Sequence, residues 1–335
     1  MPSFCTAVVT EVLLERPGLQ RVDTDMGRAY TLTQLTGPVA LGDRVVLNTT
    51  AVELGLGTGG WHVVHWNLER ESWSQPGAGH IMKLRYTSLQ VDTGGAEELH
   101  ADLPSDLSGM PVVVCGVHSQ VPAVAVLAAI PAARVAYVMT DGAALPLALS
   151  DLVFAMVETG VVTATVTAGH AFGGDLEAVS VPSALVLARH VLAADVTIVA
   201  MGPGVVGTET ALGTTSVEVA GILDAATALG GTAIAALRMS SGDRRPRHQG
   251  VSHHSRTALD LARSPAMVAA PHDGAFSHPR HDVRTVAPPP VGELLADAGL
   301  HVTTMGRGPA EDPLFFAAAG AAGALAATIA SPPTA

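Results

Sequence analysis

Two patterns of hydrophobic and polar positions divide the chain. From Phe4 to about Asn67, short runs such as TAVVTEVLLE, LQRVDTD and WHVVHW mix apolar and polar residues and are separated by glycine-containing turns. Short strands at regular spacing with such turns are typical of a small barrel or curled sheet. We therefore predict a small all-β, barrel-like domain over residues 1–75 and a connector over residues 76–109.

From Met110 onward, nearly continuous apolar runs alternate with helical segments. The runs that we predict as strands are PVVVCGV, RVAYVMT, VVTATVTA, VTIVAMG, TAIAAL, AMVAAP, VRTVA and HVTTM. Strands that are buried on both faces of a parallel sheet show this continuous apolarity. Residues 110–335 are therefore predicted to form an α/β domain with a mostly parallel, Rossmann-like sheet between two layers of helices.

Several helix ends can be predicted from capping patterns. The helical segment LPLALSDLVFAMVETG ends at Gly160, a residue type common after a helix C-terminus. Another helix is predicted over residues 176–193. Thr215 and Glu218 have the spacing of a capping box, which predicts a helix that starts at Thr215. Ser119 follows the first strand of this domain and is predicted as a helix N-cap.

Composition narrows the class of protein. A hydrophobic fraction of 48% provides ample material for a core, and the formal charge of −12 argues against a nucleic-acid partner. The amino terminus lacks the basic and apolar pattern of a signal peptide. The longest apolar run, FFAAAGAAGALAATIA, is shorter than the ~20 residues that span a bilayer. We expect a cytoplasmic protein without a membrane partner, in which Cys115 is a buried free thiol.

Polar residues follow nearly every predicted strand. They include His118, Asp141, His170, Asp175, the glycine loop after Met201, the run from Ser240 to His254, His272 and Arg307. The carboxyl ends of parallel strands lie on one edge of a sheet, and ligands bind outside that edge in open α/β folds. The sequence therefore predicts a functional site at the carboxyl edge of the sheet.

The glycine loop is the first candidate at this edge. Gly202, Gly204 and Gly207 follow a strand and match the dinucleotide pattern G-x-G-x-x-G. However, no acidic residue ends the next strand at the spacing of ~20 residues. The helix start predicted at Thr215 also makes the loop long. A phosphate or carboxylate bound by the loop, including Thr208, is favoured over a nicotinamide or flavin.

Arginines and histidines supply the remaining candidates. Arg244, Arg245 and Arg247 can neutralise an anion, or they form an exposed loop paired with surface acids. Proton transfer is assigned to His118, His170 or His253, with Asp141 and Asp175 as orienting groups. The candidate ligands of a divalent metal are His118, Asp141, His170, Asp175, His253 and His254. No H-E-x-x-H spacing occurs, so the ligands would come from several loops.

Four stretches carry a resemblance to a known family. LGTGGWHVVHWN, GHIMKLRYTSLQ, RHQGVSHHSRTAL and MGRGPAEDP together resemble the bacterial domain-of-unknown-function family 3866 over nearly the whole chain. The resemblance implies that both predicted domains belong to one family sequence, and it implies no reaction.

These observations define four hypotheses. The first is an enzyme that binds a small anionic ligand, phosphorylated or nucleotide-like, and catalyses hydrolysis or group transfer, with a divalent metal as the candidate cofactor. The second is a non-catalytic metabolite-sensing or assembly module. The third is a homo-oligomeric structural protein, in which the histidines and aspartates of the edge would point in different directions. The fourth is a nicotinamide- or flavin-dependent oxidoreductase.

Overall fold

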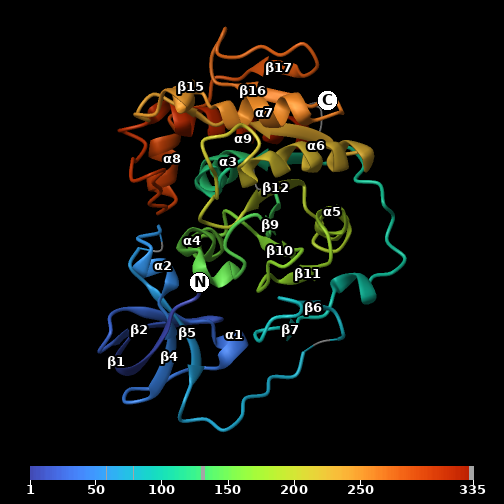
Figure 1. Ribbon diagram of the computed structural model, residues 1–335. Coiled ribbons are helices and arrows are strands. Elements are labelled where there is room, and N and C mark those ends of the chain that lie inside the picture. The colour runs from blue at the N-terminus through green and yellow to red at the C-terminus, as the bar shows by residue number, and fades with distance from the viewer. Residues whose placement is uncertain (58, 78, 130–132, 332–335) are drawn as a thin grey trace. The chain divides into compact units, whose positions relative to one another are not determined.

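A computed structural model describes residues 1–57, 59–77, 79–129 and 133–331 of the chain (Figure 1). The chain divides into two compact units, Met1–Gly94 and Gly95–Ala335, which we call the barrel unit and the α/β unit. The division falls within the segment expected to be a connector.

The barrel unit is a closed barrel of five strands in the order β1-β2-β3-β5-β4. Its elements are β1 (Phe4–Arg16), β2 (Leu19–Thr24), β3 (Ala29–Thr31), α1 (Thr33–Thr36), β4 (Arg44–Asn48), α2 (Thr50–Glu53) and β5 (His62–Asn67). Small apolar side chains such as Val9, Val22 and Leu47 fill the barrel. A separate antiparallel pair, β6 (Met82–Lys83) and β7 (Val91–Asp92), follows in the same unit.

The α/β unit contains an eight-stranded sheet in the order β11-β10-β9-β12-β8-β13-β16-β17. The strands are β8 (Pro111–Cys115), β9 (Val135–Thr140), β10 (Ala164–Ala168), β11 (Leu176–Ala178), β12 (Val196–Met201), β13 (Thr232–Ala236), β16 (Met267–Ala270) and β17 (Asp282–Thr285). Every neighbouring pair is parallel. The central strands β8, β9 and β12 are buried along their whole length, as their apolarity predicts.

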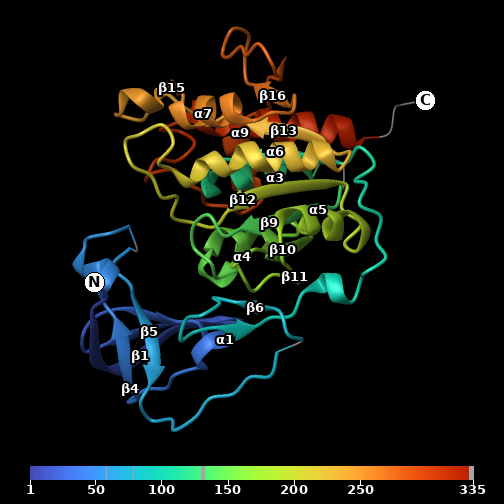
Figure 2. The ribbon, with the colours of Figure 1, turned by 45° about the vertical axis from the view of Figure 1, so that its right-hand side comes forward.

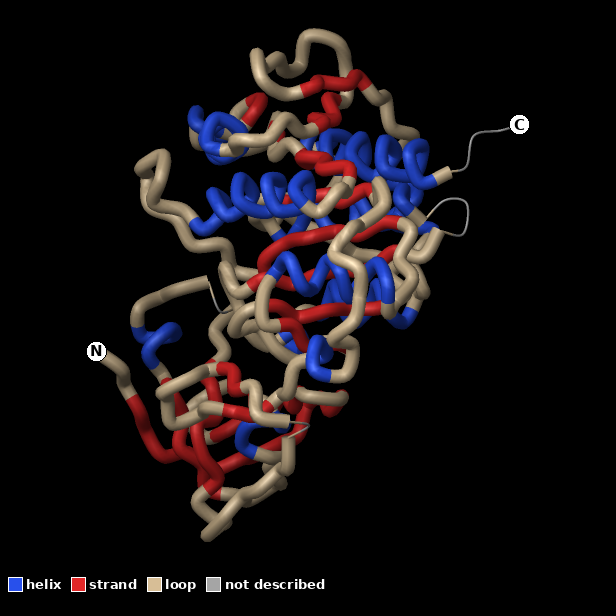
Figure 3. Tube along the Cα trace, turned by 90° about the vertical axis from the view of Figure 1, so that its right-hand side faces the viewer, coloured by secondary structure: helices blue, strands red, loops and turns tan. Residues whose placement is uncertain are grey.

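Helices cover both faces of this sheet (Figures 2 and 3). Val112 and Val114 of β8 pack in a core with α5 (Val181–His190), α6 (Glu218–Ala228) and α7 (His253–Leu261). Val113 and Cys115 pack on the opposite face with α3 (Val121–Ala128), α4 (Asp151–Glu158), α8 (Val291–Asp297) and α9 (Pro313–Ala330). This three-layer arrangement confirms the predicted Rossmann-like fold and the barrel that precedes it.

By length and composition, α9 is the one helix of the described chain that could cross a membrane. Half of its apolar window is buried, and the helix packs on α3, β8 and β13. Gly323 faces the backbone of Val124 so closely that no side chain fits between the two helices. These contacts are those of a core helix in the α/β unit.

Two predicted secondary-structure elements differ from the structure. Residues 301–305, predicted as the strand HVTTM, form no strand; residues 301–303 are irregular, and a single bridge joins Thr304 and Arg307 around a turn at residues 305–306. Residues 176–193 begin with the edge strand β11, and the helix starts only after Ser180. The Ser180 hydroxyl accepts a hydrogen bond from the backbone N–H of Ser183, which fixes this start.

The predicted caps at Thr215 and Ser119 are also wrong. A 3₁₀ helix, η4 (Thr215–Val217), precedes α6, and Thr214 caps it. Glu218 does not fold back on this cap, because its carboxylate accepts hydrogen bonds from Thr140 at 2.8 and 3.0 Å. Ser119 lies inside a 3₁₀ helix, η2 (His118–Gln120).

Candidate functional site

The polar run after β13 folds into a hairpin at the carboxyl edge of the sheet. Strands β14 (Met239–Ser240) and β15 (Gly250–Val251) pair antiparallel, and a 3₁₀ helix, η5 (Pro246–His248), lies between them. Helix α7 begins directly after the hairpin at His253, and the Ser252 hydroxyl caps it by accepting from the N–H of His254. This local fold brings three histidines together, with ring centroids 4.1 to 5.1 Å apart.

We call His248, His253, His254, Arg238, Arg245 and Arg247 the histidine–arginine cluster. Each of its three histidines offers one ring nitrogen, and these atoms lie within 4.8 Å of one another. The Nε2 atoms of His253 and His254 are buried, and neither has a hydrogen-bond partner in the described part of the chain. Nearly all buried polar atoms of proteins are paired, so these atoms mark unfilled bonding capacity.

Arg238 is the most deeply buried arginine of the cluster. It lies between β13 and β14, is only 8% exposed, and places Nη1 3.5 Å from Nδ1 of His254. Among the residues that the structure describes, no carboxylate lies within 4.0 Å of its guanidinium nitrogens. Burial, together with the charge of Arg245, lowers its pKa to about 10. With His254 and Ser216 it lines a cavity of about 20 Å³, which holds about one water molecule.

The other arginines have carboxylate partners. Arg245 binds Asp243 through two nitrogens at 2.9 and 2.7 Å, and this contact holds the pKa of Asp243 well below its usual range. Arg307 lies 3.5 Å from the same carboxylate. Arg247 lies 3.3 Å from Glu209, while its buried Nε–H has no described partner. Arg245 therefore stabilises the hairpin, and Arg247 joins it to the glycine loop.

Burial and the nearby arginines lower the pKa values of all three histidines. Burial and the charges of Arg238 and Arg245 lower the pKa of His248 to about 3. Burial, His253 and Arg238 lower the pKa of His254 to about 4, and burial and Arg247 lower the pKa of His253. Neutral imidazole can donate one hydrogen bond to an anion or bind a metal through its free nitrogen.

The glycine loop reaches the cluster through Glu209 and extends beside β15 and the start of α7 (Figure 2). Its backbone is bonded internally, since the N–H of Thr208 donates to the Gly213 carbonyl. Gly202 is buried, and a Cβ atom there would lie 2.5 Å from the carbonyl oxygen of Ala144. Gly204 has a φ of +94°, and Gly207 forms a bridge with Thr214. The loop thus folds as a closed hairpin, and an anion cradle formed by its N–H groups stays a prediction.

A second group of polar residues lies at the ends of β9 and β10. The carboxylate of Asp141 accepts a hydrogen bond from the backbone N–H of His170 at 2.9 Å. Glu218, bonded to Thr140, is the neighbouring acid, and burial and the charge of Asp141 raise its pKa to about 7. A carboxyl group with such a pKa can exchange protons near neutral pH. This role of Glu218 could not be predicted from the sequence, because Glu218 fits a helix cap equally well.

The structure does not bring His118 and Asp175 to either group. His118 is buried, and its ring nitrogens lie 2.7 Å from the Ser150 hydroxyl and 3.2 Å from the Met201 carbonyl. Burial lowers the pKa of His118 to about 4, so the ring is uncharged. It connects the start of α4 to the end of β12. Asp175 accepts hydrogen bonds from Thr165, because residues 169–175 run back to start β11 alongside β10.

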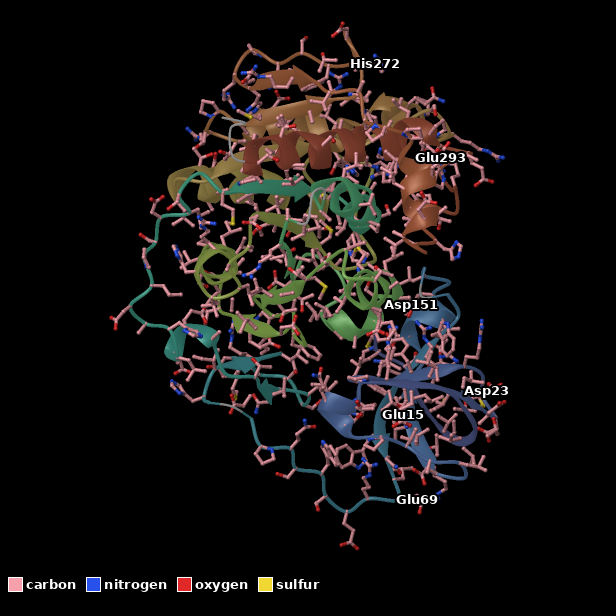
Figure 4. All side chains as sticks on the ribbon, turned by 180° about the vertical axis from the view of Figure 1, so that it is seen from behind. Glu15, Asp23, Glu69, Asp151, His272 and Glu293 are labelled. Atoms are coloured by element: carbon pink, nitrogen blue, oxygen red, sulfur yellow. The ribbon has the colours of Figure 1, made fainter. Side chains whose placement is uncertain are left out.

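The sequence predicted that the polar residues after the strands would meet in one site. The structure corrects this prediction, because these residues form separate groups. Figure 4 labels His272, an expected member of the edge site that follows β16, and shows it far from Asp151 at the start of α4. Arg244, expected in the anion pocket, is exposed. Arg238 was missing from the sequence prediction, although its place after the apolar strand TAIAAL follows the rule that identified the other candidates.

Fold and cluster together define a two-unit protein, in which a small barrel precedes a Rossmann-like unit with histidines and arginines at the carboxyl edge of its sheet. The chain matches the family described as protein of unknown function (DUF3866) over residues 28–323, and it belongs to this family. The match includes residues of both units and confirms the resemblance. No curated protein and no solved structure matches the chain.

Proposed function

We propose that this protein binds the phosphate group of a small ligand at the histidine–arginine cluster, and that it is an enzyme that hydrolyses or transfers that group. The observation that carries the proposal is Arg238, a buried guanidinium that makes no ion pair within 4.0 Å in the described part of the chain. The charge of Asp243 partly offsets the burial of Arg238, but that carboxylate is bound by Arg245. A bound oxyanion would supply a countercharge in direct contact with Arg238.

The surrounding donors support the same ligand class. The Nε–H of Arg247 is buried without a described partner, and guanidinium groups bind phosphate oxygens through paired hydrogen bonds. His253 and His254 stand at the start of α7, where the backbone of a helix favours negative charge.

The cellular setting belongs to the same proposal. We place the protein in the cytoplasm, without a nucleic-acid or membrane partner. The formal charge of −12, the free thiols of Cys5 and Cys115 and the packed position of α9 support this placement. Assembly into a homo-oligomer stays a prediction.

Ligand binding tests the proposal directly. Calorimetric titration with inorganic phosphate, ribose 5-phosphate and AMP should detect binding that Arg238→Met weakens about tenfold or more, since hydrogen bonds to charged groups contribute about 1.5–3 kcal/mol. Arg244→Met, which removes an exposed arginine six residues further along the chain, is the matched control and should leave the affinity unchanged.

The ligand-free variant provides a check on folding. Removing an unpaired buried charge should leave the melting temperature of Arg238→Met equal to or above that of the parent protein. Unchanged phosphate affinity in a folded Arg238→Met protein would contradict the proposed site. Phosphate binding without turnover of any phosphate ester would instead favour the metabolite-sensing module.

A further inference from the structure

We propose that His248, His253 and His254 hold one divalent transition-metal ion, and that this ion and the anion bind together, each strengthening the binding of the other. The inference rests on the proposed function, because it assigns a cofactor to the same anion site. Neither the metal site nor its coupling to the anion follows from the family match.

The three histidines have the donor set of a transition-metal centre. Three imidazoles from one segment of the chain present nitrogens within 4.8 Å of one another, and two of these rings carry buried Nε2 atoms without described partners. Bonds of 2.0–2.1 Å in a tetrahedral site would bring the nitrogens to about 3.4 Å apart, so each pair would have to approach by at most about 1.4 Å. Three histidines and one open position are a common arrangement in catalytic zinc sites.

Ser252 orients His248, one of the three proposed metal ligands. Its hydroxyl lies 2.8 Å from Nδ1 of His248, which orients the ring and leaves Nε2 available. Ser252 also caps α7 and so fixes where the other two histidines start the helix. The metal ligands and their support therefore form one short structural unit.

Asp243, the acidic residue between β14 and β15, already has arginine partners. Asp243 binds Arg245 at 2.7 Å and lies 3.5 Å from Arg307, so it is not available as a fourth ligand. The fourth position of a metal held by the three histidines would remain open. An oxygen of the anion is the ligand that fits this position.

The arginines explain why metal and anion should bind together. Arg238, Arg245 and Arg247 carry positive charge around the histidines and therefore disfavour a bare divalent cation. An anion on the open position reverses this repulsion, because it contacts the metal on one side and Arg238 and Arg247 on the other. Linkage then requires the metal to raise the affinity for the anion by the same factor.

Cobalt is a direct probe of such a site. Full-length protein is freed of metal with a chelator, and Co²⁺ is titrated with and without inorganic phosphate while the visible absorption of four-coordinate Co²⁺ is recorded. We expect one Co²⁺ per chain, and phosphate should tighten its binding about tenfold or more, within the usual range of coupling between sites. His254→Ala and His254→Gln should abolish the band. His272→Ala, which removes an exposed histidine outside the cluster, should leave it unchanged.

The outcomes separate this inference from the proposed function. Phosphate binding that persists unchanged in excess chelator, with no cobalt band, overturns the metal site and leaves the anion site standing. A cobalt band that survives in folded His254→Gln places the metal elsewhere and also overturns the inference. Absence of phosphate binding both with and without metal overturns the proposed function as well.

Discussion

Glu218 should make the stability of the α/β unit depend on pH in a direction opposite to that of a salt-bridged acid. Its carboxyl group is largely buried at the start of α6 and accepts hydrogen bonds from Thr140. Burial and the charge of Asp141 raise its pKa from the ordinary 4.5 to about 7. Glu218→Gln keeps an acceptor for Thr140 and removes the ionisation.

The magnitude follows from linkage between protonation and folding. Below about pH 4.5 the group is protonated in both folded and unfolded chains and contributes nothing. As the pH rises to about 7, the unfolded chain loses this proton while the folded chain keeps it, so the free energy of unfolding falls. At about 1.36 kcal/mol per unit of pKa, the loss reaches about 3 kcal/mol and stays constant at higher pH.

Guanidinium unfolding of the parent protein and of Glu218→Gln between about pH 4 and pH 8 measures this difference. We expect the variant to gain stability relative to the parent as the pH rises. Asp141→Asn should show part of the same gain, because it removes one charge that raises the pKa of Glu218. Parallel pH profiles of the parent and Glu218→Gln would refute the reasoning.

Two further predictions concern packing and thiol reactivity. Gly202→Ala should destabilise the unit by about 1–3 kcal/mol because its Cβ would meet the Ala144 carbonyl. Gly221→Ala on the exposed side of α6, where a Cβ meets nothing, should stabilise by about 1 kcal/mol; equal melting temperatures would contradict both. A thiol reagent should modify Cys5 in the native protein and Cys115 only after unfolding, since Cys115 is fully buried. Modification of both thiols under native conditions would exclude this burial.

The fold could be predicted to the extent that hydrophobic pattern determines it. Central strands such as β8 and β12 are apolar at every position because both faces are covered. The pattern fails where a short apolar run has no strand partner, as at residues 301–305, which turn at Gly306. The pattern also failed to predict β11, because a run of three residues at a sheet edge resembles the first turn of the helix that follows.

Individual residues of the candidate site could be predicted from the sequence, but which of them lie together could not. His253 and His254 could be identified because they follow a strand and are adjacent in the sequence. Their partnership with Arg238 depends on the path of the hairpin, which hydrophobic periodicity does not encode. Asp175 was assigned to the wrong end of β10, because the return of the chain toward β11 leaves no local signal.

The position of α9 has a consequence for how the protein is made. This helix packs on β8, β13 and β16, strands that all leave the ribosome before it does. The part of this sheet face that α9 covers therefore stays exposed during synthesis until residues 313–330 emerge, although α3, α4 and α8 on the same face are made earlier. At translation speeds of about 5–20 residues per second, the interval between the end of β8 and α9 lasts about 10 seconds or more. During that interval the nascent chain is a natural client for chaperones that bind exposed apolar strands.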